Sequence, residues 1–292
     1  MPGESVEWLP EEPFSLADTL LSGQAFRWQP FEEGFLGVAE DRVCYARQEG
    51  GRLVLQGVRS ESDRAFWRNY FDVDRSYALL RQAVCRDAHM QKALAACGGL
   101  RLLRQSFWET VISFILSANN NIPRISGMIE RLCRRYGKSL GCFMGRELYG
   151  FPSPEALAEA DRTELRALGL GYRDRYVKET AQRFASGAFD LKLLEGKDRS
   201  AARSILMTLP GVGAKVADCI LLFGVGRQDA FPVDTWVRKV MCRLYFDGAE
   251  SKTVSVRQIE AFAAGYFPDY AGYAQQVLFH YIRNHINTKE EA

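Results

Sequence analysis

The sequence of 292 residues lacks the features that mark several special classes of protein. Its seven cysteines are odd in number and are scattered without any C-x-x-C pair, which argues against a disulfide framework and against a zinc site. No apolar run approaches the length of a membrane span, and residues 1–7 contain neither the basic nor the apolar stretch of a secretion signal. We therefore expect a cytoplasmic protein that holds no metal and contacts no membrane.

An excess of charge of one sign is also absent. The 38 lysines and arginines nearly balance the 36 aspartates and glutamates, which gives a net charge of +2. This balance is too weak to indicate a polyanionic partner, so any such partner would have to be bound by locally clustered charges. With 47% hydrophobic residues, the composition is that of an ordinary globular protein with two domains, or with one large domain and subdomains.

Residues 1 to about 58 contain most of the β-favouring segments. Short runs at residues 26–29, 35–38, 43–46 and 53–56 are separated by turn signals, which predicts an antiparallel meander. From Ser60 the apolar spacing becomes helical, and we predict helices near residues 60–71, 75–85, 87–97, 106–115, 122–137, from 153, from 172, up to 208, and at 214–223, 235–244, 255–267 and 272–286. The predicted fold class is α+β, with an N-terminal antiparallel β-sheet domain at residues 1–100 and an almost entirely helical domain at residues 101–292.

The sequence LPGVG at residues 209–213 separates two of these predicted helices. Pro210 lacks an N–H and the two glycines tolerate positive φ, so the helix must stop and restart here. Such a hairpin directs free N–H groups outward from a helix N-terminus, which suits a phosphate; the alternative is an ordinary glycine turn between core helices. Lys215 follows in the first turn of the second helix, and Asp234 lies further on, before another predicted helix.

These motifs resemble the helix-hairpin-helix-Gly/Pro-Asp DNA glycosylase superfamily, and more closely the 8-oxoguanine DNA glycosylases of the eukaryotic type. The resemblance is dense from Gln105 to His280, and it includes SANNN at residues 117–121, LGLGYR at 168–173 and AGYAQ at 271–275. A thinner match covers SGQAFRW at residues 22–28. The cysteine pattern excludes the four-cysteine iron–sulfur cluster that some relatives carry.

The resemblance implies a base-excision-repair enzyme, a bifunctional DNA glycosylase and AP lyase. It would remove 8-oxoguanine opposite cytosine from double-stranded DNA, as a monomer without a cofactor, in the nucleoid of a bacterium or the nucleus of a eukaryote. Lys215 would form a Schiff base with C1′ of the sugar, and the N-terminal end of its helix disfavours the ammonium form. Asp234 would cap a helix and stabilise the oxocarbenium-like charge. From the residues alone, the alternative is that Lys215 is an ordinary cation on a solvated face.

Four residues match the family's pocket for the flipped base: Gly23, Cys219, Gln275 and Phe279. The carbonyl of Gly23 would accept a hydrogen bond from N7–H, a donor that normal guanine lacks. Gln275 would pair with the Watson–Crick edge, and Cys219 and Phe279 would cover the two faces of the base. From the residues alone, Gly23 is explained as a turn glycine and Phe279 as a core residue.

The family also reads the base opposite the lesion. The resemblance assigns Asn119 and Arg124 to the estranged cytosine, and Arg173 to the same base, while the ring of Tyr172 would wedge into the vacated stack. Without the resemblance, residues 117–121 form a polar loop that caps two helices. Tyr172 and Arg173 would then be a buried tyrosine and a surface arginine.

The hairpin residues Gly211, Val212 and Gly213 would contact DNA phosphates. Trp236 stands where eukaryotic members usually have a phosphate-binding histidine, and its indole N–H would be a weaker, neutral donor. Two other functions fit parts of the pattern. A glycosylase of the same superfamily with another damaged-base preference would keep Lys215 and Asp234, whereas a non-catalytic helix-hairpin-helix DNA-binding protein would need neither.

Overall fold

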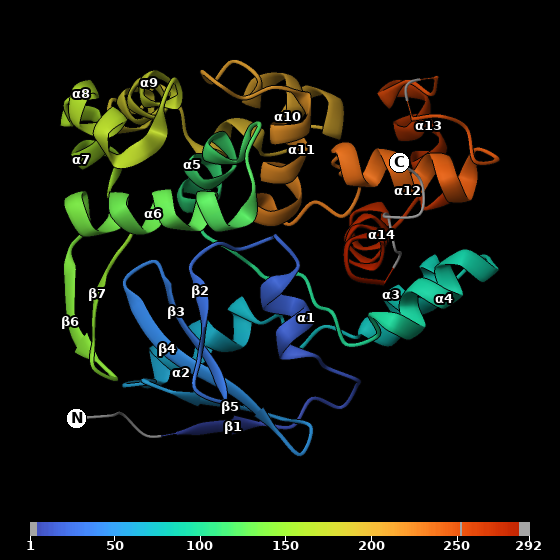
Figure 1. Ribbon diagram of the computed structural model, residues 1–292, viewed down its shortest axis with the longest axis horizontal. Helices are drawn as coiled ribbons and strands as arrows, with labels where there is room; N and C mark the ends of the chain where they lie inside the picture. The colour runs from blue at the N-terminus through green and yellow to red at the C-terminus, as the bar shows by residue number, and fades with distance from the viewer. Residues whose placement is uncertain (1–4, 252, 286–292) are drawn as a thin grey trace.

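The β-favouring runs form an antiparallel sheet in the computed structural model, which describes residues 5–251 and 253–285 (Figure 1). The sheet has five strands in the order β1-β5-β4-β3-β2, with the bounds β1 (Val6–Trp8), β2 (Trp28–Phe31), β3 (Gly34–Ala39), β4 (Arg42–Glu49) and β5 (Arg52–Gln56). Successive strands from β2 to β5 are neighbours, so the predicted meander is confirmed. The three residues of β1 are too few for a recognisable periodicity, and the sequence pattern does not predict this strand.

An aromatic core joins this sheet to helix α2 (Glu61–Tyr70). The ring of Trp28 meets that of Trp67 edge to face with centroids 5.8 Å apart, and its indole N–H donates to the hydroxyl of Tyr70 over 2.8 Å. The short helix α1 (Leu16–Leu21), which the sequence pattern does not predict, buries Leu16 and Leu20 in the same core. This packing sets the position of the loop between α1 and β2, which contains Gly23.

The remaining chain is mostly helical, as predicted. Its helices are α3 (Tyr77–Val84), α4 (Ala88–Ala96), α5 (Phe107–Ser117), α6 (Ile122–Tyr136), α7 (Pro154–Glu159), α8 (Arg162–Leu165), α9 (Arg173–Ala185), α10 (Arg199–Leu206), α11 (Ala214–Cys219), α12 (Thr235–Tyr245), α13 (Val256–Tyr266) and α14 (Ala271–His285), with π-helical or 3₁₀ turns η1 (Arg166–Leu170), η2 (Leu191–Leu194) and η3 (Ile220–Val225). None of the helices within residues 5–251 and 253–285 combines the length and apolar character needed to cross a membrane. Residue 286 of the last predicted helix, residues 1–4 and the rest of the C-terminal end lie outside the described residues.

Figure 1 shows the sheet beneath the layer of helices, with α3 and α4 beside α14. The rings of Tyr77 in α3 and Tyr273 in α14 lie 5.5 Å apart, edge to face. Met90 and Leu94 of α4 belong to the same buried cluster as the core of the helical layer. The two helices thus pack with the helical layer although they precede residue 100, and a domain boundary at that residue stays a prediction.

One β-hairpin interrupts the mostly helical chain after residue 100, and the sequence pattern does not predict it. Residues 139–149 form a two-stranded hairpin, β6 (Ser139–Phe143) and β7 (Arg146–Tyr149). Its side chains are mostly exposed, so the sequence shows no alternation of apolar residues. The hairpin is instead held by Phe143, which packs against Leu36 and Tyr45 of the first sheet. This tertiary contact is not visible in the local pattern.

Candidate active site

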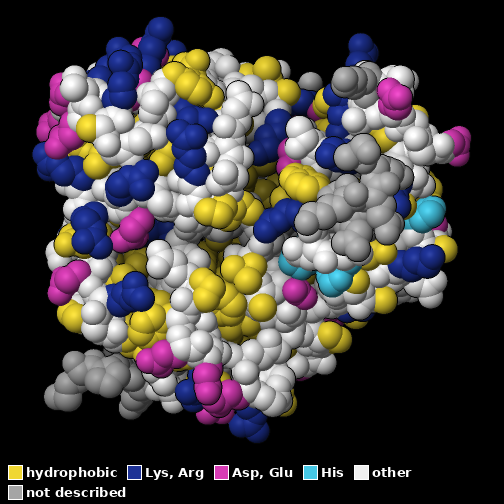
Figure 2. Space-filling model, viewed as in Figure 1, with side chains coloured by type: hydrophobic (Ala, Val, Ile, Leu, Met, Phe, Trp, Pro, Cys, Tyr) yellow, Lys and Arg dark blue, Asp and Glu magenta, His cyan; other side chains and the backbone are white. Residues whose placement is uncertain are grey.

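A cavity of about 770 Å³ opens where the Gly23 loop meets the helical layer. Its walls come from that loop, the end of α5, the start of α6, α11, the segment at residues 232–238 and α14. Figure 2 shows a hollow near the centre of the visible face, bordered by hydrophobic and by Lys or Arg side chains. Of the predicted site residues, the cavity is lined by Gly23, Asn119, Lys215, Cys219, Asp234, Trp236, Gln275 and Phe279.

Lys215 and Asp234 meet at this cavity from different helices. Lys215 lies in the first turn of α11, half-buried, with Nζ 5.4 Å from the centroid of the Phe114 ring. Asp234 is the N-cap of α12, as expected, and its Oδ1 accepts a hydrogen bond from the backbone N–H of Val237 over 2.8 Å. This bond fixes the orientation of the carboxylate at the start of α12.

Cys219 lies one helical turn after Lys215, and the charges of Lys215 and Asp234 both act on its thiol. Burial raises the pKa of its thiol to about 11, the positive charge of Lys215 opposes that rise, and the negative charge of Asp234 adds to it. The thiol is therefore protonated at neutral pH. Cys219 presents a small, neutral, polarisable surface to the cavity rather than a second nucleophile.

Gly23, Gln275 and Phe279 form the opposite wall. Gly23 has φ +76°, and a Cβ placed there would lie 3.0 Å from Cδ1 of Ile122 and 3.3 Å from Cε1 of Phe279. The side chain of Gln275 is only 4% exposed, yet its Oε1 is buried without a hydrogen-bond partner among the described residues. An unpaired buried carbonyl costs about 1–3 kcal/mol, so this oxygen is available to a ligand.

The predicted opposite-base residues lie beside the cavity, but only Asn119 lines it. Tyr172 is 51% exposed and Arg173 is 3% exposed, which is the reverse of a buried tyrosine and a surface arginine. The guanidinium of Arg173 donates to the backbone carbonyls of Ala118 and Asn119, and it lies 4.5 Å from the Tyr172 ring centroid. Arg124 is exposed.

The hairpin before α11 has the form that the glycines predict. Gly211 has φ +78°, and a Cβ there would lie 2.7 Å from the ring of Tyr176, so only glycine fits. Gly213 is the N-cap of α11, is exposed and has open space around its Cα. Trp236 lines the cavity, half-buried, with Nζ of Lys239 5.3 Å from its ring centroid.

Comparison with known proteins agrees with this geometry. A family model of HhH-GPD superfamily base excision DNA repair proteins matches residues 112–263, and one of the 8-oxoguanine DNA glycosylase N-terminal domain matches residues 8–111. The chain belongs to the 8-oxoguanine DNA glycosylases of the HhH-GPD superfamily. The N-glycosylase/DNA lyase OGG1 of Arabidopsis thaliana is 39% identical, over 94% of this chain and 80% of its own.

Two further relatives cover nearly the whole molecule. The probable N-glycosylase/DNA lyase of Methanothermobacter thermautotrophicus is 32% identical over 94% of this chain and 95% of its own length. The crystal structure of the Clostridium acetobutylicum 8-oxoguanine glycosylase/lyase, with double-stranded DNA containing cytosine opposite 8-oxoG, superposes with a TM-score of 0.90. It is 34% identical, over 96% of this chain and 95% of that chain.

Several residues that line the cavity are not identified by sequence reasoning. Phe114 and Phe223 stack with their ring centroids 5.4 Å apart and line the apolar part of the cavity. Arg238 and Arg283 also line it. Arg283 follows Phe279 by one helical turn, so the helical spacing that relates Gln275 to Phe279 could have found it.

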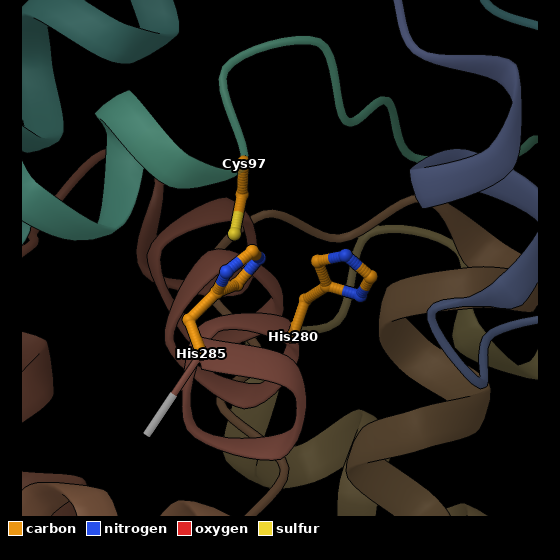
Figure 3. A group of neighbouring side chains, drawn as sticks. All are labelled: Cys97, His280 and His285. Atoms are coloured by element: carbon orange, nitrogen blue, oxygen red, sulfur yellow. The ribbon is translucent and has the colours of Figure 1, made fainter. Parts of the chain in front are cut away.

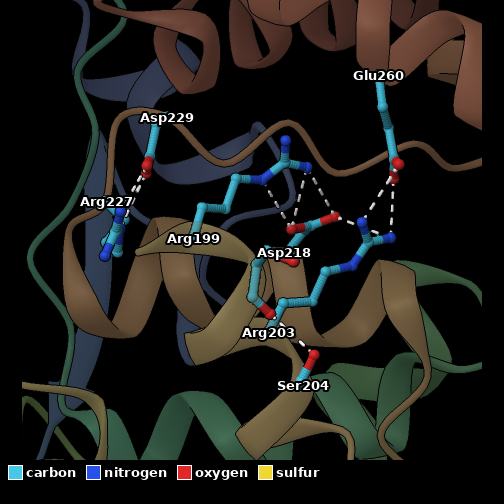
Figure 4. Close-up of polar contacts among 8 residues, drawn as sticks. Arg199, Arg203, Ser204, Asp218, Arg227, Asp229 and Glu260 are labelled. Atoms are coloured by element: carbon cyan, nitrogen blue, oxygen red, sulfur yellow. Dashed lines mark hydrogen bonds and ion pairs between the residues drawn. The ribbon is translucent and has the colours of Figure 1, made fainter. Parts of the chain in front are cut away.

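A buried ionic network connects α11 to α10 and α13 in this glycosylase (Figure 4). Asp218 is fully buried, and nitrogens of Arg199 and Arg203 from α10 lie 3.3 and 3.4 Å from its carboxylate oxygens. Arg203 also pairs with Glu260 of α13 at 2.8 Å. Burial raises the pKa of Asp218 to about 6, while the two arginines pull it down. The network joins the helix that carries Lys215 to its two neighbours.

A second polar group ties α14 of the glycosylase to the N-terminal region. The ligand atoms of Cys97, His280 and His285 lie within 4.8 Å of one another (Figure 3). Both ring nitrogens of His280 already have partners, because Nε2 is 3.1 Å from Oδ1 of Asp18 and Nδ1 is 3.0 Å from Nδ2 of Asn284. We therefore interpret the group as a contact that positions α14 and do not assign a metal site to it.

Proposed function

We propose that this chain flips 8-oxoguanine out of double-stranded DNA, excises it opposite cytosine, and nicks the strand through its lyase activity. The observation that carries the proposal is the unpaired Oε1 of Gln275 in the wall of a cavity that also contains Lys215 and Asp234. The Watson–Crick edge of a guanine offers two neighbouring donors, N1–H and the 2-amino group, to such an oxygen. The same cavity thus contains a base acceptor and the groups for glycosidic chemistry.

The walls of the cavity suit a purine that carries a hydrogen at N7. Phe279 and Cys219 would cover its two faces, and the Gly23 carbonyl would accept from N7–H. The backbone carbonyls of the residues before and after Gly23 are held, because Gln276 Nε2 donates to the Ser22 carbonyl over 2.8 Å and Gln105 Nε2 donates to the Gln24 carbonyl over 2.7 Å. A carbonyl fixed in this way would meet the bare N7 lone pair of guanine unfavourably.

The chemistry would begin with neutral Lys215. Its Nζ would form a bond to C1′ as the bond from C1′ to N9 breaks, and the departing base, which leaves with that electron pair on N9, would take up there the proton that the new ammonium nitrogen loses. The fixed carboxylate of Asp234 would stabilise the positive charge that develops on the sugar. Opening of the sugar ring gives a Schiff base, and loss of a C2′ proton then expels the 3′ phosphate, which nicks the strand.

In the DNA duplex, the ring of Tyr172 would fill the space that the flipped base leaves in the stack, and the exposure of this side chain supports the role. Asn119, Arg124 and Arg173 would hold the estranged cytosine, which offers acceptors at N3 and O2. The N–H groups of Gly211, Val212 and Gly213, with the indole N–H of Trp236, would contact phosphates. Binding as a monomer is part of the same proposal.

A borohydride trap combined with an excision panel tests the proposal. Wild-type protein should cross-link to duplex containing 8-oxoguanine, and Lys215→Gln should abolish both cross-linking and excision while binding remains. Single-turnover excision should be at least about ten-fold faster opposite cytosine than opposite adenine, because adenine leaves guanidinium donors unpaired. Excision of a different damaged base would favour the other glycosylase, and binding without any cross-link would favour a non-catalytic protein.

A further inference from the structure

Arg283 is a charged residue in the wall of the lesion cavity that no step above uses. It lies on α14, one turn after Phe279, and its guanidinium carbon is 5.6 Å from the centroid of the Phe279 ring. Its Nη1 is close to Gly23, since a Cβ at that glycine would lie 3.5 Å from it. The residue therefore lies beside both the proposed stacking ring and the glycine whose carbonyl is the proposed N7–H acceptor.

The Nη1 atom of Arg283 is buried and has no hydrogen-bond partner among the described residues. Burial lowers the pKa of this guanidinium, and the negative charge of Asp234 opposes the shift. A buried cationic donor without a partner is costly, more so than a neutral group. Since Arg283 lines a cavity that could take a ligand, the missing acceptor is expected on that ligand.

We propose that Arg283 is a specificity-determining residue that donates a hydrogen bond to O8 of the flipped 8-oxoguanine. This inference rests on the proposed function. In 8-oxoguanine, N7–H and C8=O are adjacent, so a donor and an acceptor point from neighbouring positions of one ring edge. The pair formed by the Gly23 carbonyl and the Arg283 N–H complements that order. Normal guanine presents a bare N7 and a C8–H there, and it offers the donor no oxygen at position 8.

The two unpaired polar atoms among the described cavity residues, Gln275 Oε1 and Arg283 Nη1, would each contact a different edge of the base. Gln275 Oε1 needs a donor, which the Watson–Crick edge supplies, and Arg283 Nη1 needs an acceptor, which O8 supplies. The two residues are two helical turns apart on one helix, and both line the cavity. A role limited to neutralising Asp234 would not need Nη1 beside Gly23.

The test compares Arg283→Gln and Arg283→Leu with wild type. The matched control is Arg257→Gln, which removes an exposed arginine from α13. We expect both Arg283 variants to bind and excise 8-oxoguanine at least about ten-fold less well, as for the loss of a charge-assisted hydrogen bond. Binding to the same duplex with a tetrahydrofuran abasic site should stay within about two-fold of wild type, because that ligand has no base. The control should match wild type on both duplexes.

A second arm isolates the acceptor atom by replacing O8 with sulfur, a poorer acceptor. The ratio of excision rates for the 8-oxo and 8-thio bases should be smaller in the Arg283 variants than in wild type. Equal losses on the lesion and abasic duplexes would overturn the inference in favour of a backbone phosphate contact. Unchanged excision by folded variants would overturn it as well. If wild type does not excise 8-oxoguanine, the proposed function fails, whereas normal wild-type excision with unaffected variants defeats this inference alone.

Discussion

Replacing Gly23 by alanine tests whether the shape of the cavity governs excision independently of the stability of the fold. Alanine at φ +76° pays for a left-handed backbone, about 1–2 kcal/mol of unfolding free energy. Its Cβ would also press on Ile122 at 3.0 Å and on Phe279 at 3.3 Å, so these side chains must move by a few tenths of an ångström. The movement displaces the ring that would stack on the base, and the strained backbone at residue 23 would shift the carbonyl that would accept from N7–H. Losing that one bond and leaving its groups unpaired costs about 1–3 kcal/mol, a factor of roughly 10 to 100 in excision.

The chain offers a matched control in Gly51, in the turn between β4 and β5. Its φ is +80°, but a Cβ there has no atom within 4 Å. Thermal or urea unfolding should therefore show a backbone loss of about 1–2 kcal/mol for both Gly23→Ala and Gly51→Ala, with an additional loss from side-chain contacts for Gly23→Ala. Single-turnover excision of 8-oxoguanine should fall only for Gly23→Ala. The reasoning is refuted if Gly23→Ala excises normally, or if Gly51→Ala loses excision to the same extent.

Two further predictions concern the carboxylates around α11. Asp234→Asn should change the unfolding free energy by less than about 1 kcal/mol, because asparagine also caps helices, but it should lower excision much more. Asp198→Asn alters the N-cap of α10 in the same way and is the control that should retain excision. If Asp234→Asn instead lost much stability but excised normally, the role of Asp234 would be purely structural. Folding raises the pKa of Asp218 from 3.8 to about 6. The folded protein therefore binds one more proton than the unfolded chain between these two pH values. The stabilisation from this group is complete below pH 3.8 and is lost as pH rises through 6. The difference in unfolding free energy between wild type and Asp218→Asn should thus shrink by up to about 3 kcal/mol from pH 4 to pH 7, and a pH-independent difference in urea titrations would contradict the assignment.

Most of the features that could be predicted from the sequence depend on a few consecutive residues. The hairpin follows from Pro210 and from the positive φ of Gly211, and the N-cap role of Asp234 follows from its place before a helical run. Both depend on a few consecutive residues, which sequence patterns describe well. The meander and the helices follow from apolar periodicity for the same reason.

The parts that could not be predicted depend on contacts between distant segments. Helical spacing places Arg283 on the same face of α14 as Gln275 and Phe279, but its position beside Gly23 emerges only when α14 packs against the Gly23 loop. The β6–β7 hairpin likewise depends on Phe143 reaching the outer face of the first sheet. In each case the residue type is compatible with exposure, and tertiary packing decides its environment.

Arg173, which is proposed to hold the opposite base, shows a further reason why exposure in the free protein is a poor guide to function. Arg173 is buried because the carbonyls of Ala118 and Asn119 satisfy its guanidinium, and these carbonyls belong to the loop that also lines the cavity. To hold a cytosine, the guanidinium would have to exchange these acceptors for N3 and O2 of the base. The exchange has little net cost only when the new partner supplies acceptors in equivalent positions, which cytosine does and adenine, with an amino donor beside N1, does not. Discrimination between opposite bases would then come from the replacement of hydrogen bonds already made, and the same loop would connect that replacement to the shape of the lesion cavity.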